Sequence, residues 1–186
     1  MPDLRPWKIL GSRTVSSDRW LTHTLEHVRL PSGLEISQYH VLNQNDFCLM
    51  VAVTPAGEVP LVRQYKHGAR DVVLEFPAGL VEDDETPEAA AARELLEETG
   101  YAGRMHCAGT LLTSPSRNRN LAHVFVVLDA AQVCEPEPEE TEQIEVVMTP
   151  LAQLPGLVAQ GAIRDLGSLA TYARARAAFP DLGWEG

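Results

Sequence analysis

Residues 79–101 read GLVEDDETPEAAAARELLEETGY, and this stretch decides the fold. Thr86 can cap a helix with its hydroxyl, Pro87 suits the first helical position, and Gly100 suits the left-handed residue that ends a helix. The alanines at 89–92 leave the early turns thin, so that the helix can approach a sheet closely, while Leu95 and Leu96 supply larger packing groups. The sequence therefore predicts a helix over 87–99 that packs on a sheet.

One stripe of this helix is strongly charged. Glu94, Glu97 and Glu98 recur at offsets of three and four, which places them on one side of a helix together with Arg93. Three carboxylates held together repel one another unless a hard cation binds between them, and Mg²⁺, with Mn²⁺ as the alternative, is the ion that prefers oxygen ligands. The competing interpretation is an ordinary surface helix in which Arg93 and Glu97 form an i,i+4 ion pair.

The spacing of the whole stretch decides between these interpretations. Gly79 is followed after five residues by Glu85, and a further seven residues lead to Arg93-Glu94-Leu95, Glu97-Glu98 and Gly100. This spacing resembles the Nudix box, the motif of hydrolases that cleave nucleoside diphosphates linked to another moiety. Tyr101 stands where the pattern prefers an aliphatic residue, a departure that concerns packing and not metal ligation.

The resemblance implies a fold and a ligand set. The fold would be an α/β Nudix sandwich of α/β/α layers with a mixed sheet. Glu94, Glu97 and Glu98 would bind Mg²⁺ together with the backbone carbonyl of Ala78. Arg93 would orient the glutamates through charge-assisted hydrogen bonds, and Glu85 would support the loop or an outer metal ion.

Segments outside the box resemble one branch of the family. Residues 63–68 (RQYKHG), residues 74–79 (LEFPAG) and Pro115 are similar to the ADP-ribose and ADP-sugar pyrophosphatases. In that branch the N-terminal extension exchanges between subunits and builds a homodimer. Lys66 departs from the usual arginine, and a lysine contacts phosphate as a point charge and not as a fork. The loop 113–120 also departs from the usual Pro- and Gly-rich sequence.

Strand patterns flank the box. Residues 20–30 and 34–42 read as a hairpin across Pro31-Ser32-Gly33. Further strands are predicted at 47–54, 59–65, 72–76, 108–112, 123–128 and 144–148, and further helices near 150–160 and at 163–178. The sequence thus predicts a β-rich N-terminal extension over residues 1–43 and a Nudix domain over 44–186.

The remaining site residues are expected outside the helix. By resemblance, the group that takes the proton from water lies on the acidic loop 135–142, with Glu140 as the base and Glu142 as an additional ligand. Solvated glutamates without a role are the alternative there. Four cations are candidates for phosphate or ribose contacts in an otherwise acidic protein: Arg29, Arg63, Lys66 and Arg117.

Composition limits the partners. The chain of 186 residues has 15 basic and 26 acidic residues and a net charge of −11, which disfavours a nucleic acid held by its phosphates. No apolar run is long enough to span a bilayer, and the N-terminus lacks the apolar core of a signal peptide, so we expect no membrane partner and a cytoplasmic location. The three cysteines suggest neither a disulfide framework nor a zinc site, and we expect them in the core.

The functional prediction is an enzyme, a Mg²⁺-dependent pyrophosphatase of a nucleoside diphosphate sugar. ADP-ribose, cleaved to AMP and ribose 5-phosphate, is the preferred substrate. The alternatives are hydrolysis of GDP-mannose, NADH or a dinucleoside polyphosphate. A different class is a sensing Nudix domain that binds ADP-ribose without cleaving it, but such a domain often has a broken box, and this box is intact.

Overall fold

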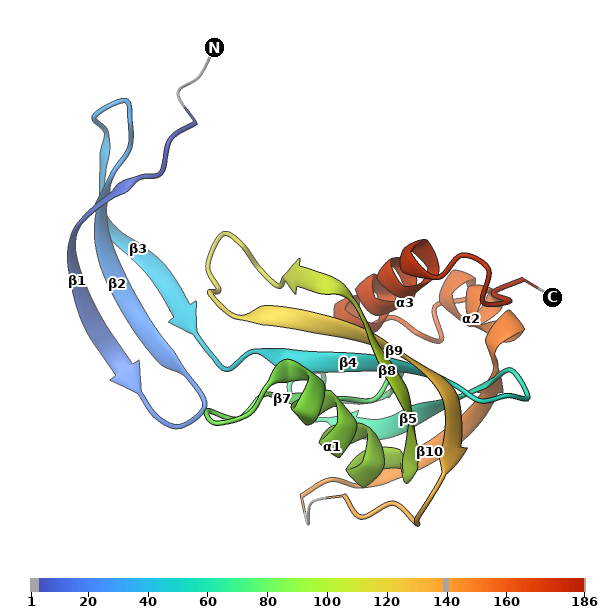
Figure 1. Cartoon of the computed structure of the whole chain (residues 1–186). Helices are drawn as coiled ribbons and strands as arrows, with labels where there is room; N and C mark the ends of the chain where they lie inside the picture. The colour runs from blue at the N-terminus through green and yellow to red at the C-terminus, as the bar shows by residue number, and fades with distance from the viewer. Residues whose placement is uncertain (1–3, 139–140, 186) are drawn as a thin grey trace. The chain divides into compact units, whose positions relative to one another are not determined.

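A computed structural model of the chain describes residues 4–138 and 141–185. Its strands and helices, in chain order, are β1 (Lys8–Ser17), β2 (Thr22–Arg29), β3 (Glu35–Asn43), β4 (Phe47–Val53), β5 (Glu58–Lys66), β6 (Asp71–Glu75), β7 (Ala78–Leu80), α1 (Pro87–Thr99), β8 (Tyr101–Leu112), β9 (Leu121–Gln132), β10 (Ile144–Pro150), the 3₁₀ helix η1 (Leu151–Gln153), α2 (Leu154–Ala159) and α3 (Leu166–Ala178). Figure 1 shows these elements along the chain.

The chain divides into two compact units. The first unit contains the described residues up to Asn45 together with Leu112–Leu121. Within it, β1, β2 and β3 form an antiparallel sheet, and the inserted loop is attached to that sheet by a parallel bridge between Leu42 and Asn118 and by an ion pair between Arg119 and Glu26. The predicted hairpin is confirmed, whereas β1 was not predicted as a strand. The domain boundary at residue 43 stays a prediction.

The second unit contains two sheets. One has the strand order β7-β4-β9-β8, in which β4 and β9 are parallel and β7 is antiparallel to β4. The other has the order β10-β5-β6 and is antiparallel. Strand β7, which carries the first residues of the box, is only three residues long. Because the structure has a mixed sheet in an α/β unit, the predicted fold class is confirmed.

Alternation along β4 separates two cores. Cys48, Met50 and Ala52 pack against Ala90, Ala91 and Leu95 of α1. Val51 and Val53 join a cluster that includes Tyr172 of α3. Successive side chains of a strand point to opposite faces, so α1 and α3 cover opposite faces of the same sheet. In Figure 1, α1 runs along the face of the sheet formed by β4 and β9. This sheet therefore supports α1.

Helix α1 has the predicted bounds. Thr86 caps it by accepting a hydrogen bond of 3.2 Å from the backbone N–H of Ala89, Pro87 begins it, and Gly100 ends it with φ at 75°. A side chain at Gly100 would meet the backbone of Cys134, so glycine is required there for space as well as for its positive φ. The local signals of the sequence therefore position the box accurately.

The C-terminal helices begin later than predicted. The helix expected near 150–160 is a 3₁₀ turn followed by α2, and α3 begins at Leu166 because Asp165 caps it by accepting from Ser168 N at 2.7 Å. The Ser168 hydroxyl accepts from Phe76 N, which ties α3 to the segment before β7. No helix in the described part of the chain is both long and apolar enough to cross a membrane.

The cysteines fit the prediction only in part. Cys48 is fully buried in β4, as expected, whereas Cys107 and Cys134 are exposed. The prediction that all three lie in the core is therefore wrong for two of them. Cys107 falls on an exposed position of β8, and Cys134 lies beyond the end of β9.

Candidate active site

Arg93 connects the charged residues of the box. Its guanidinium donates to both carboxylate oxygens of Glu85, at 3.1 and 3.0 Å, and its Nη1 donates to Glu94 at 2.8 Å and to Glu97 at 3.1 Å. Its Nη2 also donates to the carbonyl of Leu80 at 3.1 Å. Only the planar fork of an arginine can serve this many acceptors at fixed angles. These contacts are the ones that the predicted orienting role of Arg93 requires, and the role itself stays a prediction.

The ion pairs shift the pKa values of their members. The carboxylate of Glu85, followed by that of Glu94, raises the pKa of Arg93 above its ordinary value, so the guanidinium stays charged. In return, the hydrogen bonds from Arg93 lower the pKa of Glu85. Glu85 is thus an ionised anchor that holds Arg93 against the loop before α1.

Glu94 lies directly over Gly79. A Cβ built on Gly79 would come within 1.8 Å of Glu94 Cδ, so any side chain there would displace the carboxylate. Burial raises the pKa of Glu94, while the hydrogen bond and charge of Arg93 act in the opposite direction. The close approach of backbone to carboxylate explains why the box begins with glycine.

Glu98 is almost completely enclosed, with 1% of its surface exposed. Its Oε2 accepts from the backbone N–H of Ala78 at 3.0 Å. Burial raises the pKa of Glu98 to about 8 against the effect of that hydrogen bond, and the carboxylates of Glu94 and Glu142 add to the rise. A bound cation would reverse this shift because it favours the ionised carboxylate.

The donor set suits a hard divalent cation. Glu94, Glu97 and Glu98 offer carboxylate oxygens, and Ala78, whose N–H contacts Glu98, is the fourth predicted ligand. Among the described residues, no three acidic, histidine or cysteine side chains are close enough to hold an ion together. The reason is visible in the contacts: Glu94 and Glu97 turn to Arg93, whereas Glu98 turns to the backbone of β7. The oxygen chemistry fits Mg²⁺ or Mn²⁺, and the metal site stays a prediction.

The acidic loop approaches the box, where the backbone N–H of Glu137 donates to the carbonyl of Glu97 at 2.9 Å. Glu140, the predicted base, lies outside the described residues. Glu142 is described, and its charge raises the pKa values of both Glu94 and Glu98, although burial is the main cause for each. Glu142 is therefore electrostatically coupled to the box, as a ligand or a proton acceptor must be.

Lys66 pairs with a buried acid that had no predicted role. Its Nζ lies 3.1 Å from Glu75 Oε1, which also accepts from Gln64 Nε2 at 3.0 Å. Burial raises the pKa of Glu75, and the charge of Lys66 opposes that rise. The same ammonium group also lowers the pKa of Glu98 against the larger effect of burial. Lys66 is therefore electrostatically coupled to the box. The sequence feature that could have indicated a buried Glu75 is its position as an acidic residue within the apolar run 72–76.

The other candidate cations have different partners. Arg63 is also on β5, at an odd offset from Lys66, so the two point to opposite faces of that strand. Arg63 forms an exposed ion pair with Glu145 at 3.0 Å. The structure therefore does not bring Arg63 and Lys66 together.

Arg29 and Arg117 both belong to the first unit. Arg29 forms an ion pair with Glu35 at 2.7 Å on the antiparallel sheet. The backbone of Arg117 pairs with Leu42 and Ser114, which fixes the inserted loop. Their substrate contacts stay predictions.

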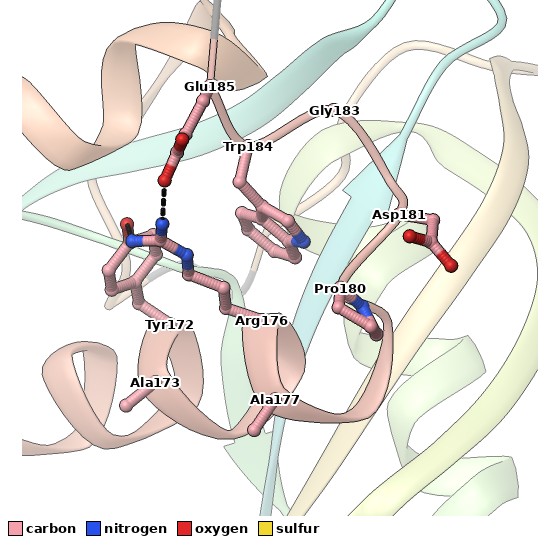
Figure 2. Close-up of a pocket in the computed structure, with 9 residues that line it drawn as sticks. All are labelled: Tyr172, Ala173, Arg176, Ala177, Pro180, Asp181, Gly183, Trp184 and Glu185. Atoms are coloured by element: carbon pink, nitrogen blue, oxygen red, sulfur yellow. Dashed lines mark hydrogen bonds and ion pairs between the residues drawn. The ribbon is translucent and has the colours of Figure 1, made fainter.

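A separate hollow lies at the C-terminal end of the second unit. It has a volume of about 740 Å³ and is lined by residues of α3 and the segment after it, and none of its lining residues belongs to the box. Figure 2 shows Glu185 directed at Arg176 beside Tyr172 and Trp184. Trp184 is buried, and its indole N–H donates to Phe179 O at 2.7 Å. The aromatic residues here pack the end of α3.

Comparison with known proteins places the chain in a family. Residues 45–171 match the NUDIX domain, and residues 7–42 match the nucleoside diphosphate sugar hydrolase N-terminal domain. The chain also resembles a solved structure titled "Crystal structure of ADP compounds hydrolase", with a TM-score of 0.86, 23% identity, and coverage of 99% of this chain and 100% of that one. At this identity the resemblance concerns the fold alone.

Three curated proteins show the range of relatives. An ADP-ribose pyrophosphatase of Bacillus subtilis is 30% identical over 160 residues, which cover 85% of this chain and 86% of that protein. An ADP-sugar pyrophosphatase of Mus musculus is 42% identical over 98 residues, covering 50% of this chain but only 45% of that protein. A GDP-mannose pyrophosphatase of Cronobacter sakazakii is 38% identical over 118 residues, with 58% and 60% covered. From the domain match, the relatives and the intact box, we conclude that the chain belongs to the NUDIX family and is one of its pyrophosphatase enzymes.

Proposed function

We propose that the protein hydrolyses the diphosphate bond of ADP-ribose, with Mg²⁺, to give AMP and ribose 5-phosphate. The single observation that carries the proposal is the fork of Arg93, which holds Glu85, Glu94 and Glu97 around one guanidinium. The choice of substrate is supported by the similarity over most of the chain to a protein named ADP-ribose pyrophosphatase.

The residues of the box would bind the metal ion. Glu94, Glu97 and Glu98 would supply carboxylate oxygens, and Ala78 would supply its carbonyl. When bound, Mg²⁺ neutralises charge on a diphosphate and lowers the pKa of water. Arg93 keeps two of these carboxylates oriented, and Glu85 anchors Arg93 in turn.

Other residues would handle the substrate and the proton. Glu142 or Glu140 would accept the proton of the attacking water, since a carboxylate outside the metal ligands is free to do so. Lys66 would face a phosphate as a point charge, and Arg29, Arg63 and Arg117 are the further candidates for phosphate or ribose contacts. Each would supply local positive charge for an anionic substrate in a chain of net charge −11.

GDP-mannose is the second candidate substrate, because a GDP-mannose pyrophosphatase is 38% identical over 118 residues. The deciding experiment is product analysis by chromatography after incubation with Mg²⁺ and, in parallel, ADP-ribose, GDP-mannose, NADH and a dinucleoside polyphosphate. AMP released fastest from ADP-ribose supports the proposal. Faster cleavage of another substrate contradicts the substrate assignment and leaves the chemistry intact, and binding without cleavage contradicts both.

A homodimer is part of the proposal. The first unit exposes several large apolar side chains on or beside its three-stranded sheet: Trp7, Ile9, Val15, Trp20 and Leu34. A second copy of the chain is the partner that would cover them, as exposed apolar patches often mark interfaces. Light scattering after size-exclusion chromatography tests this, and the mass of one chain of 20.4 kDa would contradict it. We propose a cytoplasmic location and no nucleic-acid partner.

A further inference from the structure

Three side chains of the second unit form a hydrogen-bonded chain at the edge of the box. His123 Nε2 lies 3.0 Å from Asp46 Oδ2, and His123 Nδ1 lies 3.2 Å from the hydroxyl of Thr110. Because an ionised carboxylate only accepts, Nε2 carries a proton, and in the neutral ring Nδ1 then accepts from Thr110. The imidazole is mostly enclosed, with 15% of its side chain exposed.

The backbone of Asp46 continues this chain into the box. Its carbonyl accepts from Val81 N at 2.9 Å, one position beyond the pairing of Phe47 with Leu80 that ends the ladder of β4 and β7. The neighbouring carbonyl, that of Leu80, accepts from Arg93 Nη2. The contacts of His123 thus lead through hydrogen bonds to the arginine that organises the carboxylates.

The strand register explains how these residues meet. Cys48 of β4 pairs with Gly79 on one side and with His123 on the other. Residues paired across neighbouring strands share a face, and Asp46, two positions before Cys48, shares it as well. Cys48 packs against α1, so His123 and Asp46 are on the face that α1 covers.

The need for such support follows from the length of β7. This strand pairs with β4 over only three residues, yet it carries Ala78 and Gly79 at the start of the box. Three pairs are a weak constraint on a segment that must hold its position to a fraction of an ångström for metal binding. A side-chain bond that fixes residue 46 adds a constraint where the ladder ends.

We propose that His123 is a positioning residue for the box. Through its bond to Asp46 it holds the end of β7 and Val81, and with them the Leu80 carbonyl that Arg93 contacts. Its catalytic consequence rests on the proposed function, but its effect on the end of β7 does not. The alternative is an ion pair that stabilises the fold without any effect on the box.

The direct test is amide hydrogen exchange at Val81 in metal-free protein. His123→Leu removes the donor to Asp46, whereas His123→Gln retains a side-chain N–H that can replace Nε2–H. We expect exchange at Val81 to accelerate by about tenfold in the leucine variant, as for a locally opened segment, and to return toward wild type in the glutamine variant. His40→Leu, in the first unit, is the matched control. Unchanged exchange at Val81 in His123→Leu would overturn the proposal.

The second readout is binding of Mn²⁺ without substrate, measured by electron paramagnetic resonance. We expect the dissociation constant for Mn²⁺ to rise by about tenfold in His123→Leu. Removing a residue that supports metal ligands typically lowers metal affinity by about 10–100-fold, and an indirect support should lie at the low end of that range. If wild type binds Mn²⁺ but cleaves no substrate, the proposed function fails while this test remains valid. A lower melting temperature with unchanged exchange and unchanged Mn²⁺ affinity would show a purely structural role and overturn the proposal.

Discussion

Gly79 and Glu94 are so close that no side chain fits between them: a Cβ on Gly79 would lie 1.8 Å from Glu94 Cδ and 2.2 Å from Oε1. The carboxylate therefore rests on the backbone of β7, at the position where the metal site is predicted. A glycine at residue 79 is required for the space it leaves, because its φ is not in the left-handed region.

Gly79→Ala should disable the enzyme more than it destabilises the fold. The added methyl group displaces Glu94, and a misplacement of about 1 Å near reacting groups can cost about 10²-fold in rate. The measurement is kcat/KM for ADP-ribose beside the melting temperature. Gly11→Ala is the control, because a Cβ at Gly11 meets nothing within 4 Å. Equal activity of the two variants would refute the steric argument.

Arg93→Lys should lower activity although it keeps the charge. An ammonium group cannot reach Glu85, Glu94 and Glu97 together as the fork does, and loss of a partner behind metal ligands costs about 10–100-fold in affinity or activity. Steady-state kinetics over a range of Mg²⁺ concentrations would locate the loss. Arg104→Lys is the control, because Arg104 forms an exposed ion pair with Asp129. A fully active Arg93→Lys would show that the fork is dispensable.

Two of the three thiols should react quickly in the native protein. Burial raises the pKa of Cys48 to about 12, so at pH 8 this group remains a protonated and enclosed thiol, whereas Cys107 and Cys134 are exposed. Because the thiolate is the reactive form, Ellman's reagent should titrate two equivalents at once and the third only after denaturation. Cys48→Ala should leave the fast phase at two equivalents. A fast phase that falls to one would contradict the assignment.

The buried carboxyl of Glu75 should contribute to the pH dependence of stability. Its folded pKa lies above the ordinary value of 4.5, so the folded protein binds this proton more tightly than the unfolded chain does. The free energy of unfolding should then decline as the pH rises from about 4.5 through the folded pKa. Glu75→Gln should lessen that decline, and urea denaturation of both proteins across this range measures it. A steeper decline in Glu75→Gln would contradict a raised pKa of Glu75 in the folded protein.

The sequence predicts most strongly where signals are local. The cap at Thr86, the stop at Gly100 and the charged stripe of α1 all lie within the single segment 86–100, and the structure has them as predicted. The bond between His123 and Asp46 joins residues 77 positions apart, so no local pattern could indicate it. Strand β7 is too short to produce a periodic signal.

Pairing between distant segments also explains the remaining differences. The loop Leu112–Leu121 belongs with the N-terminal sheet through Leu42 and Asn118, which are far apart in the chain. The convergence of three carboxylates was inferred from helical offsets alone. In the structure Arg93 binds Glu94 and Glu97, whereas the Ala78 N–H binds Glu98. Helical offsets alone do not predict which partner each carboxylate takes.

We propose that the box hydrolyses a nucleoside diphosphate sugar by means of carboxylates that would bind a metal ion. The most direct measurement is the rate of AMP release from ADP-ribose with saturating Mg²⁺ for wild type, Glu97→Gln and the control Glu88→Gln, an exposed residue of the same helix. We predict that Glu97→Gln loses about 10²-fold or more in kcat, because charge stabilisation worth several kcal/mol is weakened, while Glu88→Gln matches wild type. Equal rates for Glu97→Gln and wild type would contradict this proposal.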